Sequence, residues 1–176
     1  MELSFLYSIP RTEFLDSFFL AVTNIAGSYG QLWLAVGIFL LFFKKTRSTG
    51  IAVLISYIGV FVFGQFILKS LVSRPRPCHI DQAFELLVKR PSSSSFPSTH
   101  SAWAFGGATV IFMRFKKAGI VTFVAAALIA FSRMYMFLHF PTDVLAGMIM
   151  GIIFGITAVK ICDLAAKRKA EGLNSR

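Results

Sequence analysis

Polar residues are scarce in this sequence. Only 15% of its 176 residues are charged, whereas 56% are hydrophobic and the mean hydropathy is +0.70. A soluble domain of this length needs far more polar surface, so the composition excludes that class and predicts an integral membrane protein. At about 20 residues per span, the length holds five or six helices and leaves no room for a soluble domain. We therefore expect one membrane domain over residues 1–176.

Cysteine and histidine are also few. The two cysteines, Cys78 and Cys162, are expected on opposite sides of the membrane, which makes a disulfide between them improbable. His79 follows Cys78, but a Cys/His metal site needs more ligands than this stretch offers, so we expect a solvated loop histidine. The first dozen residues lack a basic region followed by an apolar run, and no cleaved signal peptide is expected.

Acidic residues are outnumbered by basic ones, 8 against 18, for a formal net charge of +10. On a soluble protein this excess would suggest a nucleic-acid partner. Here the basic residues form runs beside apolar stretches, as the positive-inside rule describes, so we expect membrane lipids and no nucleic acid. The runs cover 44–47, 114–117 and 167–169 and are predicted to mark the cytoplasmic face of the cell membrane, with the C-terminus on that side.

The apolar stretches predict an all-α bundle of six transmembrane helices. A short interfacial helix is expected within residues 1–12 and one long outer loop over 73–97. The Arg-Pro-Arg-Pro sequence at 74–77 ends the third span, because proline lacks a backbone donor and restricts its predecessor. The Gly-Ser-Tyr-Gly break at 27–30 leaves open whether 14–43 crosses twice or forms one long tilted helix. The predicted spans are 14–27, 31–44, 50–72, 98–113, 118–138 and 142–162.

Glycine recurs every four residues on the last predicted span, at Gly147, Gly151 and Gly155. Small residues at this spacing allow close contact between helices in a membrane. We favour packing within the bundle, and the alternative is a face for a homo-oligomer.

When each predicted span is traced from its basic run on the cytoplasmic face to its other end, the ionisable residues of the apolar segments come together. They all fall near the outer face, although nothing in the charge runs requires it. Ionisable groups beside hydrocarbon are costly and by default indicate a functional site. The predicted site contains Lys69, Arg76, His100, Arg133, His139 and Asp143.

His139 and Asp143 are one helical turn apart. At this spacing the carboxylate is able to accept a hydrogen bond from one imidazole nitrogen, which fixes the other as an unprotonated nucleophile or base. The alternative is an aspartate helix cap beside an interfacial histidine.

Three cations, Lys69, Arg76 and Arg133, accompany this pair. A lone Arg133 is explained as an interfacial anchor, but three converging cations suit a tetrahedral phosphate dianion. The helix start at Ser98 and Thr99 adds hydroxyls and free N–H groups, which bind phosphate at helix N-termini. Ordinary capping by Ser98 is the alternative there. His100, in the first turn, is a candidate proton donor.

Three motifs follow one another: Lys69-x6-Arg76-Pro77, Pro97-Ser98-Thr99-His100 and Ser132-Arg133-x5-His139-x3-Asp143. In these motifs the chain resembles the type 2 phosphatidic acid phosphatase superfamily, the membrane lipid phosphate phosphatases. It departs at Thr99, where the family usually has glycine, and a positive φ there would strain threonine. Arg74-Pro75 nearly repeats Arg76-Pro77; the family spacing selects Arg76, and Arg74 is left as a second headgroup contact.

The resemblance implies a metal-independent hydrolase without a cofactor. His139 would attack phosphorus, oriented by Asp143, and His100 would protonate the leaving group and then activate water on a phosphohistidine. The groups that the resemblance assigns to the phosphoryl oxygens are Lys69, Arg76, Ser98, Thr99 and Arg133.

The substrate is not settled by these residues. An outward-facing site with spare cations favours undecaprenyl pyrophosphate in a bacterial membrane, and the family alternatives are phosphatidylglycerol phosphate, phosphatidate and lipid A phosphates. Two other classes remain open: an anion-binding membrane transporter, and a metal-dependent hydrolase that uses His100, His139 and Asp143 as ligands. A transporter usually shows paired halves with broken helices, and no such repeat is visible.

Overall fold

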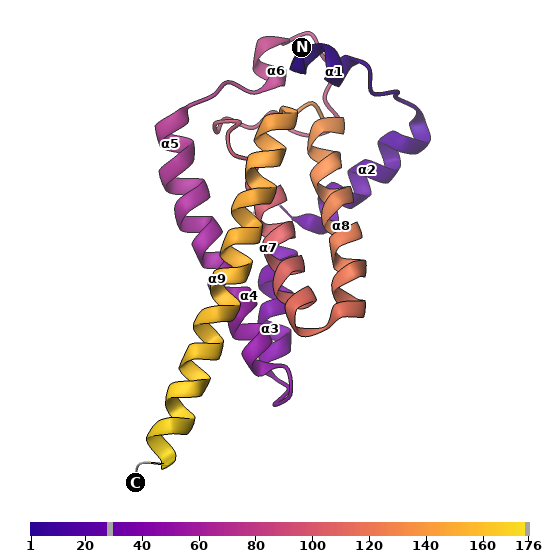
Figure 1. The fold of residues 1–176 in the computed structure, drawn as a ribbon. Coiled ribbons are helices and arrows are strands. Elements are labelled where there is room, and N and C mark those ends of the chain that lie inside the picture. Colours follow the sequence, from indigo (N-terminus) through magenta and orange to yellow (C-terminus); the bar gives the residue numbers. More distant parts are fainter. Residues whose placement is uncertain (28–29, 175–176) are drawn as a thin grey trace.

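The structure, a computed structural model, describes residues 1–27 and 30–174. All regular elements in these ranges are helical, which confirms the predicted all-α fold (Figure 1). In chain order they are α1 (Glu2–Tyr7), α2 (Glu13–Ala26), α3 (Gln31–Leu41), α4 (Arg47–Val60), the π-helix η1 (Phe61–Leu68), α5 (Lys69–Val72), α6 (Pro77–Ile80), α7 (Thr99–Arg114), α8 (Lys116–Tyr135) and α9 (Pro141–Asn174).

Helix α7 is the central element of the bundle. It packs against α9, α8 and α4, and all but a few of its residues are buried. Small side chains explain the close approach, since alanine or glycine occupies positions 102, 104, 106, 107 and 108. The start of α7 is thereby fixed inside the bundle, where the predicted site lies.

The glycines of α9 face α7. A Cβ atom built on Gly151 would lie 2.2 Å from the carbonyl oxygen of Ala102, and one on Gly147 would lie 2.3 Å from that of Ser98. Gly155 meets the carbonyl oxygen of Gly106 in the same way, at 2.7 Å. This face of α9 is therefore used for packing within the bundle, the favoured of the two alternatives.

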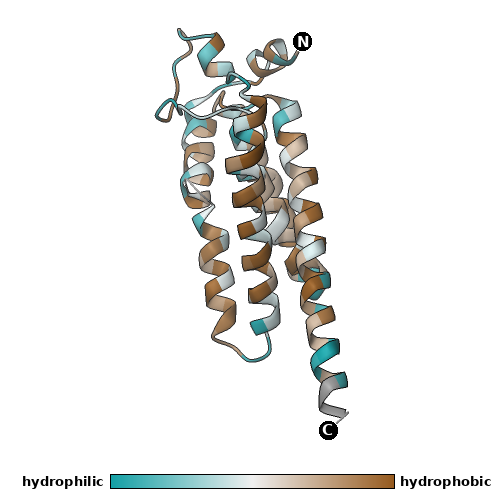
Figure 2. Ribbon diagram, turned by 90° about the vertical axis from the view of Figure 1, so that its left-hand side faces the viewer, coloured by the Kyte–Doolittle hydropathy of each residue, from teal (hydrophilic) through white to brown (hydrophobic). Residues whose placement is uncertain are grey.

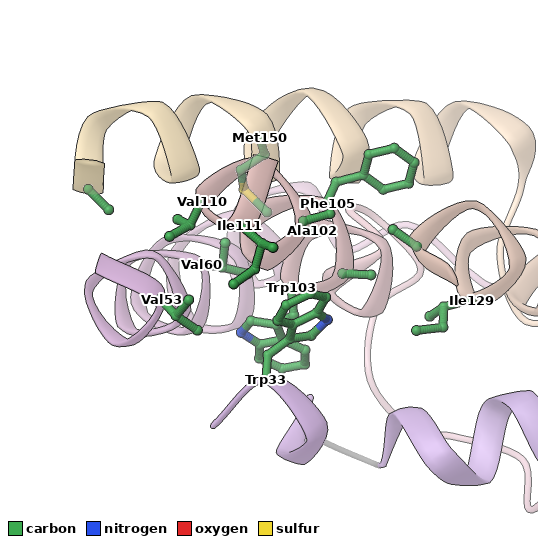
Figure 3. Close-up of a cluster of buried hydrophobic side chains, with 14 of the residues drawn as sticks. Trp33, Val53, Val60, Ala102, Trp103, Phe105, Val110, Ile111, Ile129 and Met150 are labelled. Carbon is green, nitrogen blue, oxygen red and sulfur yellow. The ribbon is translucent and has the colours of Figure 1, made fainter. Parts of the chain in front are cut away.

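The hydrophobic core lies between α3, α4, α7, α8 and α9 (Figure 3). Trp33 and Trp103 meet at its centre, and both are almost fully buried. The close approach of α3 depends on Gly30, because a Cβ atom there would lie 2.7 Å from the indole of Trp103. Gly27 and Gly30 also both have positive φ, +72° and +66°, which glycine adopts without strain.

The predicted break between 14–27 and 31–44 is present, since α2 ends at Ala26 and α3 begins at Gln31; Ser28 and Tyr29 lie outside the described residues. The count of six spans is not confirmed. Among the described residues, three stretches are long and apolar enough to cross a membrane, and α2 with α3 would form a fourth as one bent span. At about 1.5 Å per residue, α2 and α3 are each too short to cross about 30 Å of hydrocarbon alone.

The other boundaries follow the sequence prediction with small shifts. The third predicted span, 50–72, is a composite of α4, η1 and α5, and the fifth ends at Tyr135 rather than 138. The last helix runs past 162 to Asn174, because the basic tail continues it. The loop 73–97 contains the short helix α6, and α1 is the predicted N-terminal helix.

The two ends of the bundle differ in character. Helix α1, the loop 73–97 and the turn between α8 and α9 gather at one end, whereas the turns after α3 and α7 and the tail of α9 lie toward the other (Figure 1). Hydrophilic residues concentrate at these ends, and the helices between them are largely hydrophobic (Figure 2). The three basic runs therefore share one side of the bundle, opposite the predicted site.

Replacing Gly151 by leucine is expected to destabilise the bundle. The side chain would press on the backbone of α7, and overpacking of this kind costs about 1–3 kcal/mol. The midpoint of thermal unfolding in detergent should fall. The control is Ala165→Leu on the exposed tail of α9, which should leave the midpoint unchanged; equal midpoints for both variants would contradict this account of the glycines.

Candidate active site

Lys69 is turned into the bundle by an irregular helix. The π-helix η1 ends directly before it, and the N–H of Lys69 donates to the carbonyl of Gly64, five residues back. A wider turn rotates the residues that follow around the helix axis, and π-turns are frequent at functional sites. Lys69 is only 8% exposed as a result. The sequence pattern gave no sign of this π-turn.

Arg76 is held by the serine-rich part of the loop 73–97. Its Nε donates to the carbonyl of Ser93 at 2.8 Å, and its Nη2 to the Ser93 hydroxyl at 3.1 Å and the carbonyl of Ser94 at 3.2 Å. Its Nη1 donates to the carbonyl of Leu138 at 3.0 Å. Arg76 thus ties the loop to the turn that carries His139.

The turn between α8 and α9 explains the spacing from Arg133 to His139. The carbonyl of Arg133 accepts the N–H groups of both Leu138 and His139, at 3.1 and 3.2 Å, which closes the turn. Phe137 takes a positive φ of +58° inside it and stacks on Phe84 with a centroid distance of 3.9 Å. A non-glycine residue in this region is strained and persists only where packing holds it.

The contacts of His139 define its tautomer. Its Nε2 lies 3.0 Å from Nη1 of Arg76, and a guanidinium only donates, so Nε2 is the acceptor and carries no proton. The proton of the neutral ring is therefore on Nδ1. The free lone pair that nucleophilic attack requires is thus on Nε2, beside the arginine predicted to bind phosphate.

The predicted hydrogen bond between His139 and Asp143 is not formed. Their Nδ1 and Oδ2 atoms are 3.9 Å apart, beyond hydrogen-bond range, and no described residue bonds Nδ1. The carboxylate is held by other donors: Oδ2 accepts from the hydroxyl of Ser95 at 2.5 Å and the N–H of Phe140 at 2.8 Å. Catalytic hydrogen bonds are often long without substrate, so the pair keeps a geometry from which the bond can form.

Ser95 is a residue that sequence reasoning missed. It is fully buried, and its hydroxyl touches the carboxylate of Asp143 across 48 positions of sequence. Its only signal was membership of the polar run 92–95, which is typical of any exposed loop.

Arg74 forms an ion pair with Asp143. Its Nη1 donates to Oδ1 of Asp143 at 2.7 Å and its Nη2 to Oε2 of Glu2 at 2.6 Å, and its guanidinium covers the ring of Phe140 at 4.2 Å. Glu2 also accepts from the backbone N–H and the hydroxyl of Thr142. Helix α1 is thereby attached to the start of α9. The structure places Arg74 in this cluster, where its guanidinium is paired with two carboxylates.

The start of α7 carries three predicted site residues, and each of them has a different structural role. Ser98 is the N-cap: it is fully buried, its hydroxyl accepts from the N–H of Ser101, and its own N–H donates to the carbonyl of Asp143 at 3.0 Å. Thr99 is the first helical residue and has no positive φ, so threonine is not strained where the family usually has glycine. His100 donates from Nε2 to the carbonyl of Gly27 at 3.0 Å, which leaves its Nδ1 for proton transfer.

Arg133 faces α2. Its Nη1 donates to the hydroxyl of Thr23 at 3.1 Å, whereas its buried Nε has no partner among the described residues. Leaving a buried charged donor unsatisfied costs free energy, so the position suits an incoming acceptor.

A cavity of about 550 Å³ joins these groups. Its volume is within the range of about 300–1,000 Å³ typical of small-molecule sites. It is lined by Lys69, Arg76, Thr99, His100 and Arg133 of the predicted site, with Thr23, Asn24, Gly27, Gln65, Val88, Lys89, Arg90, Pro91, Ser92, Ser93 and Leu138. His139 lies behind Arg76 and is 1% exposed.

The electrostatic setting keeps His139 neutral. Burial lowers its pKa well below 6.5, and the charges of Arg76, Arg133 and Lys69 lower it further, because each disfavours an imidazolium. A neutral ring is the form that attacks phosphorus.

The model of the PAP2 superfamily matches residues 49–165, which contain all three motifs. The chain belongs to the PAP2 superfamily. This confirms the family that the motifs indicated. The residues that line the cavity of this PAP2 chain lie within the matched region, except for Thr23, Asn24 and Gly27.

Relatives of this PAP2 chain carry several descriptions. It is 32% identical to an undecaprenyl-diphosphatase of Sulfolobus acidocaldarius over 81% of the chain and 70% of that protein. It is 28% identical to a lipid A 1-phosphatase of Rhizobium johnstonii over 84% of the chain and 70% of the relative. The crystal structure of a PAP2-type phosphatidylglycerolphosphate phosphatase of Bacillus subtilis superposes with a TM-score of 0.73 at 26% identity, covering 92% of this chain and 83% of that one.

Replacing Arg133 by lysine is expected to reduce kcat/KM for phosphate release about 10- to 100-fold. Lysine keeps the charge, but its single nitrogen cannot occupy the positions of both Nη1, which contacts Thr23, and the buried Nε. The matched control is Arg114→Lys, in the ion pair with Asp163 at the opposite end of the bundle, which should retain normal turnover. Near-normal activity of the Arg133 variant would remove this residue from the site.

The protonation of His139 is testable by NMR of histidine-labelled protein, which has only three histidines. We expect a neutral ring at pH 6, with the proton on Nδ1. Arg76→Gln should raise the pKa of His139, because it removes the nearest positive charge. Signals are assigned with His79→Asn and His100→Asn. Titration of His139 at or above pH 6.5 in the unmodified protein would contradict the assignment.

Proposed function

We propose that this protein is a membrane lipid phosphatase that removes the terminal phosphoryl group of a lipid phosphate, with undecaprenyl diphosphate as the favoured substrate. One observation supports it above others: Lys69, Arg76, Arg133 and His100 line a single cavity, and the unprotonated Nε2 of His139 lies 3.0 Å from Arg76. A tetrahedral anion bound between the cations would sit beside a nucleophile.

The first step transfers the phosphoryl group to His139. Nε2 attacks phosphorus while the bond from phosphorus to the leaving oxygen breaks, and that oxygen takes the Nδ1 proton of a His100 that enters the step protonated, while its Nε2–H stays on the carbonyl of Gly27. Arg76 leaves Nε2 and binds the phosphoryl oxygens, where Lys69 and Arg133 also stabilise the charge of the transition state. As the ring becomes positively charged, its Nδ1–H moves toward the carboxylate of Asp143, 3.9 Å away.

The second step is hydrolysis of the phosphohistidine. Water attacks phosphorus, His100 takes its proton through Nδ1, and the bond between phosphorus and Nε2 breaks to return neutral His139. The carbonyl of Gly27 holds the His100 ring in place throughout. No metal or cofactor takes part in this scheme.

The substrate proposal is supported by the relatives and by charge. The undecaprenyl-diphosphatase is 32% identical to this chain, and the cavity has more cations than one phosphoryl group needs. Lipid A phosphates, phosphatidate and phosphatidylglycerol phosphate are the alternatives to be compared directly.

The site is proposed to face the extracytoplasmic side of the cell membrane. The basic runs at 44–47, 114–117 and 167–169 lie at the end opposite the site, and basic loops stay in the cytoplasm. The last helix then ends in the cytoplasm. Because α1 and the end of α9 lie at opposite ends, an odd number of crossings fits this arrangement, with α2 and α3 forming one bent span.

The function is tested by a phosphate-release panel with the purified chain in detergent micelles. The substrates are undecaprenyl diphosphate, phosphatidylglycerol phosphate, phosphatidate and a lipid A phosphate. We expect release from lipid substrates, fastest from undecaprenyl diphosphate, and a loss of at least about 10³-fold for His139→Gln, since no nucleophile remains. The wild-type chain incubated with terminally ³²P-labelled substrate and quenched in alkali should carry label that the variant lacks.

Two controls separate the competing classes. Lys44→Gln, in the turn between α3 and α4 at the opposite end of the bundle, should leave phosphate release unchanged. Activity that survives EDTA supports the phosphohistidine route, and activity restored only by zinc or manganese would favour the metal-dependent alternative. Lipid or anion transport without any phosphate release by the wild-type chain would refute the enzyme proposal.

A further inference from the structure

The cavity contains two cations that belong to none of the three motifs. Lys89 and Arg90, from the loop 73–97, line it together with Lys69, Arg76 and Arg133. They lie 13 and 14 positions beyond Arg76 and enter the site through the fold of the loop.

Arg90 is poised to bind an acceptor. One of its terminal nitrogens, Nη2, donates to the carbonyl of Gln82 at 3.3 Å, which holds the guanidinium against the loop. The other, Nη1, is buried and has no partner among the described residues. Nε of Arg133, which lines the same cavity, is also buried and also has no partner among the described residues. Buried cationic donors without acceptors are costly, and an anion in the cavity would satisfy both.

The charge of the cavity exceeds what one phosphoryl group needs. Five cationic side chains line it, and none of the described lining residues is acidic. A phosphate monoester carries about −1.5 to −2 charges at pH 7, which the three motif cations already match. A second phosphoryl group adds negative charge and acceptor oxygens, and a cavity of about 550 Å³ has room for it.

We propose that Lys89 and Arg90 form a second phosphate subsite, which makes the protein selective for lipid diphosphates over lipid monophosphates. This inference rests on the proposed phosphatase function. The terminal phosphoryl group binds to Lys69, Arg76 and Arg133, and the phosphoryl group attached to the lipid binds to Lys89 and Arg90.

This subsite acts on the leaving group. When Nε2 of His139 bonds to the terminal phosphorus, the bond from that phosphorus to the bridging oxygen breaks, and its electron pair stays on the departing lipid monophosphate. The added negative charge develops beside Lys89 and Arg90, so the subsite stabilises the transition state more than the bound substrate. A lipid monophosphate, whose leaving group is an alcohol, gains nothing from it.

The experiment compares farnesyl diphosphate with farnesyl monophosphate, which differ only in the second phosphoryl group. Phosphate release by the full chain in detergent gives kcat/KM for each. In Lys89→Gln/Arg90→Gln we expect the ratio of kcat/KM for diphosphate over monophosphate to fall about 10- to 100-fold, the size expected for one or two charge-assisted hydrogen bonds. Glutamine removes both positive charges and keeps a polar side chain at each position.

The matched control removes two charges elsewhere. Lys44→Gln/Lys45→Gln, in the turn between α3 and α4 at the opposite end of the bundle, should leave the ratio unchanged. The inference is overturned if the Lys89/Arg90 variant loses both activities in proportion, or neither. It is also overturned if the wild-type chain prefers the monophosphate, although the proposed phosphatase function then stands. Release from neither substrate, nor from any other lipid phosphate, would refute the function itself.

Discussion

The buried carboxylate of Asp143 is the contact on which the arrangement of the site depends. It accepts from Ser95 in the loop 73–97, from the backbone of the α8–α9 turn, and from Arg74, which in turn holds Glu2 of α1. The carbonyl of Asp143 accepts from the N–H of Ser98 at the start of α7. The side chain and the backbone carbonyl of Asp143 together connect α1, the loop 73–97, the α8–α9 turn and the start of α7.

The motif residues have two separate roles in this arrangement. The contacts of Asp143 position the site, and the cavity gathers the groups that would meet a phosphate. Arg76 belongs to both, because its guanidinium ties Ser93 and Leu138 together while one nitrogen covers Nε2 of His139. In the proposed reaction a phosphoryl oxygen replaces Nε2 of His139 as an acceptor for Arg76, so binding of substrate and exposure of the nucleophile are one event. A buried, neutral His139 is stable in this setting because the surrounding cations disfavour its protonation.

The loop 73–97 supplies more of the site than its composition suggests. Its polar residues are typical of a solvated connection, yet Ser95 is buried on Asp143, Ser93 holds Arg76, and Lys89 and Arg90 line the cavity. The motifs on the helices are shared with a superfamily whose relatives are described as acting on different lipid phosphates. Selectivity is therefore best sought outside the motifs, in this loop and in the segment that contributes Thr23 of α2 and Gly27 just after it.

The sequence by itself determined the membrane class, the helical fold, the family and the convergence of Lys69, Arg76, His100 and Arg133 on one cavity, because hydropathy, basic runs and motif spacing are local signals. The count of six spans is not confirmed, since two apolar stretches broken at Gly27 and Gly30 resemble two short helices as much as one bent crossing. Only the tertiary structure decided that Asp143 is held by Ser95 and Arg74. It also decided that the carboxylate of Asp143 lies 3.9 Å from the ring of His139. The same holds for the role of Ser98 as a cap and for the π-helix that turns Lys69 inward. Contacts between segments 48 or more positions apart depend on how helices pack, and no spacing within one segment encodes them.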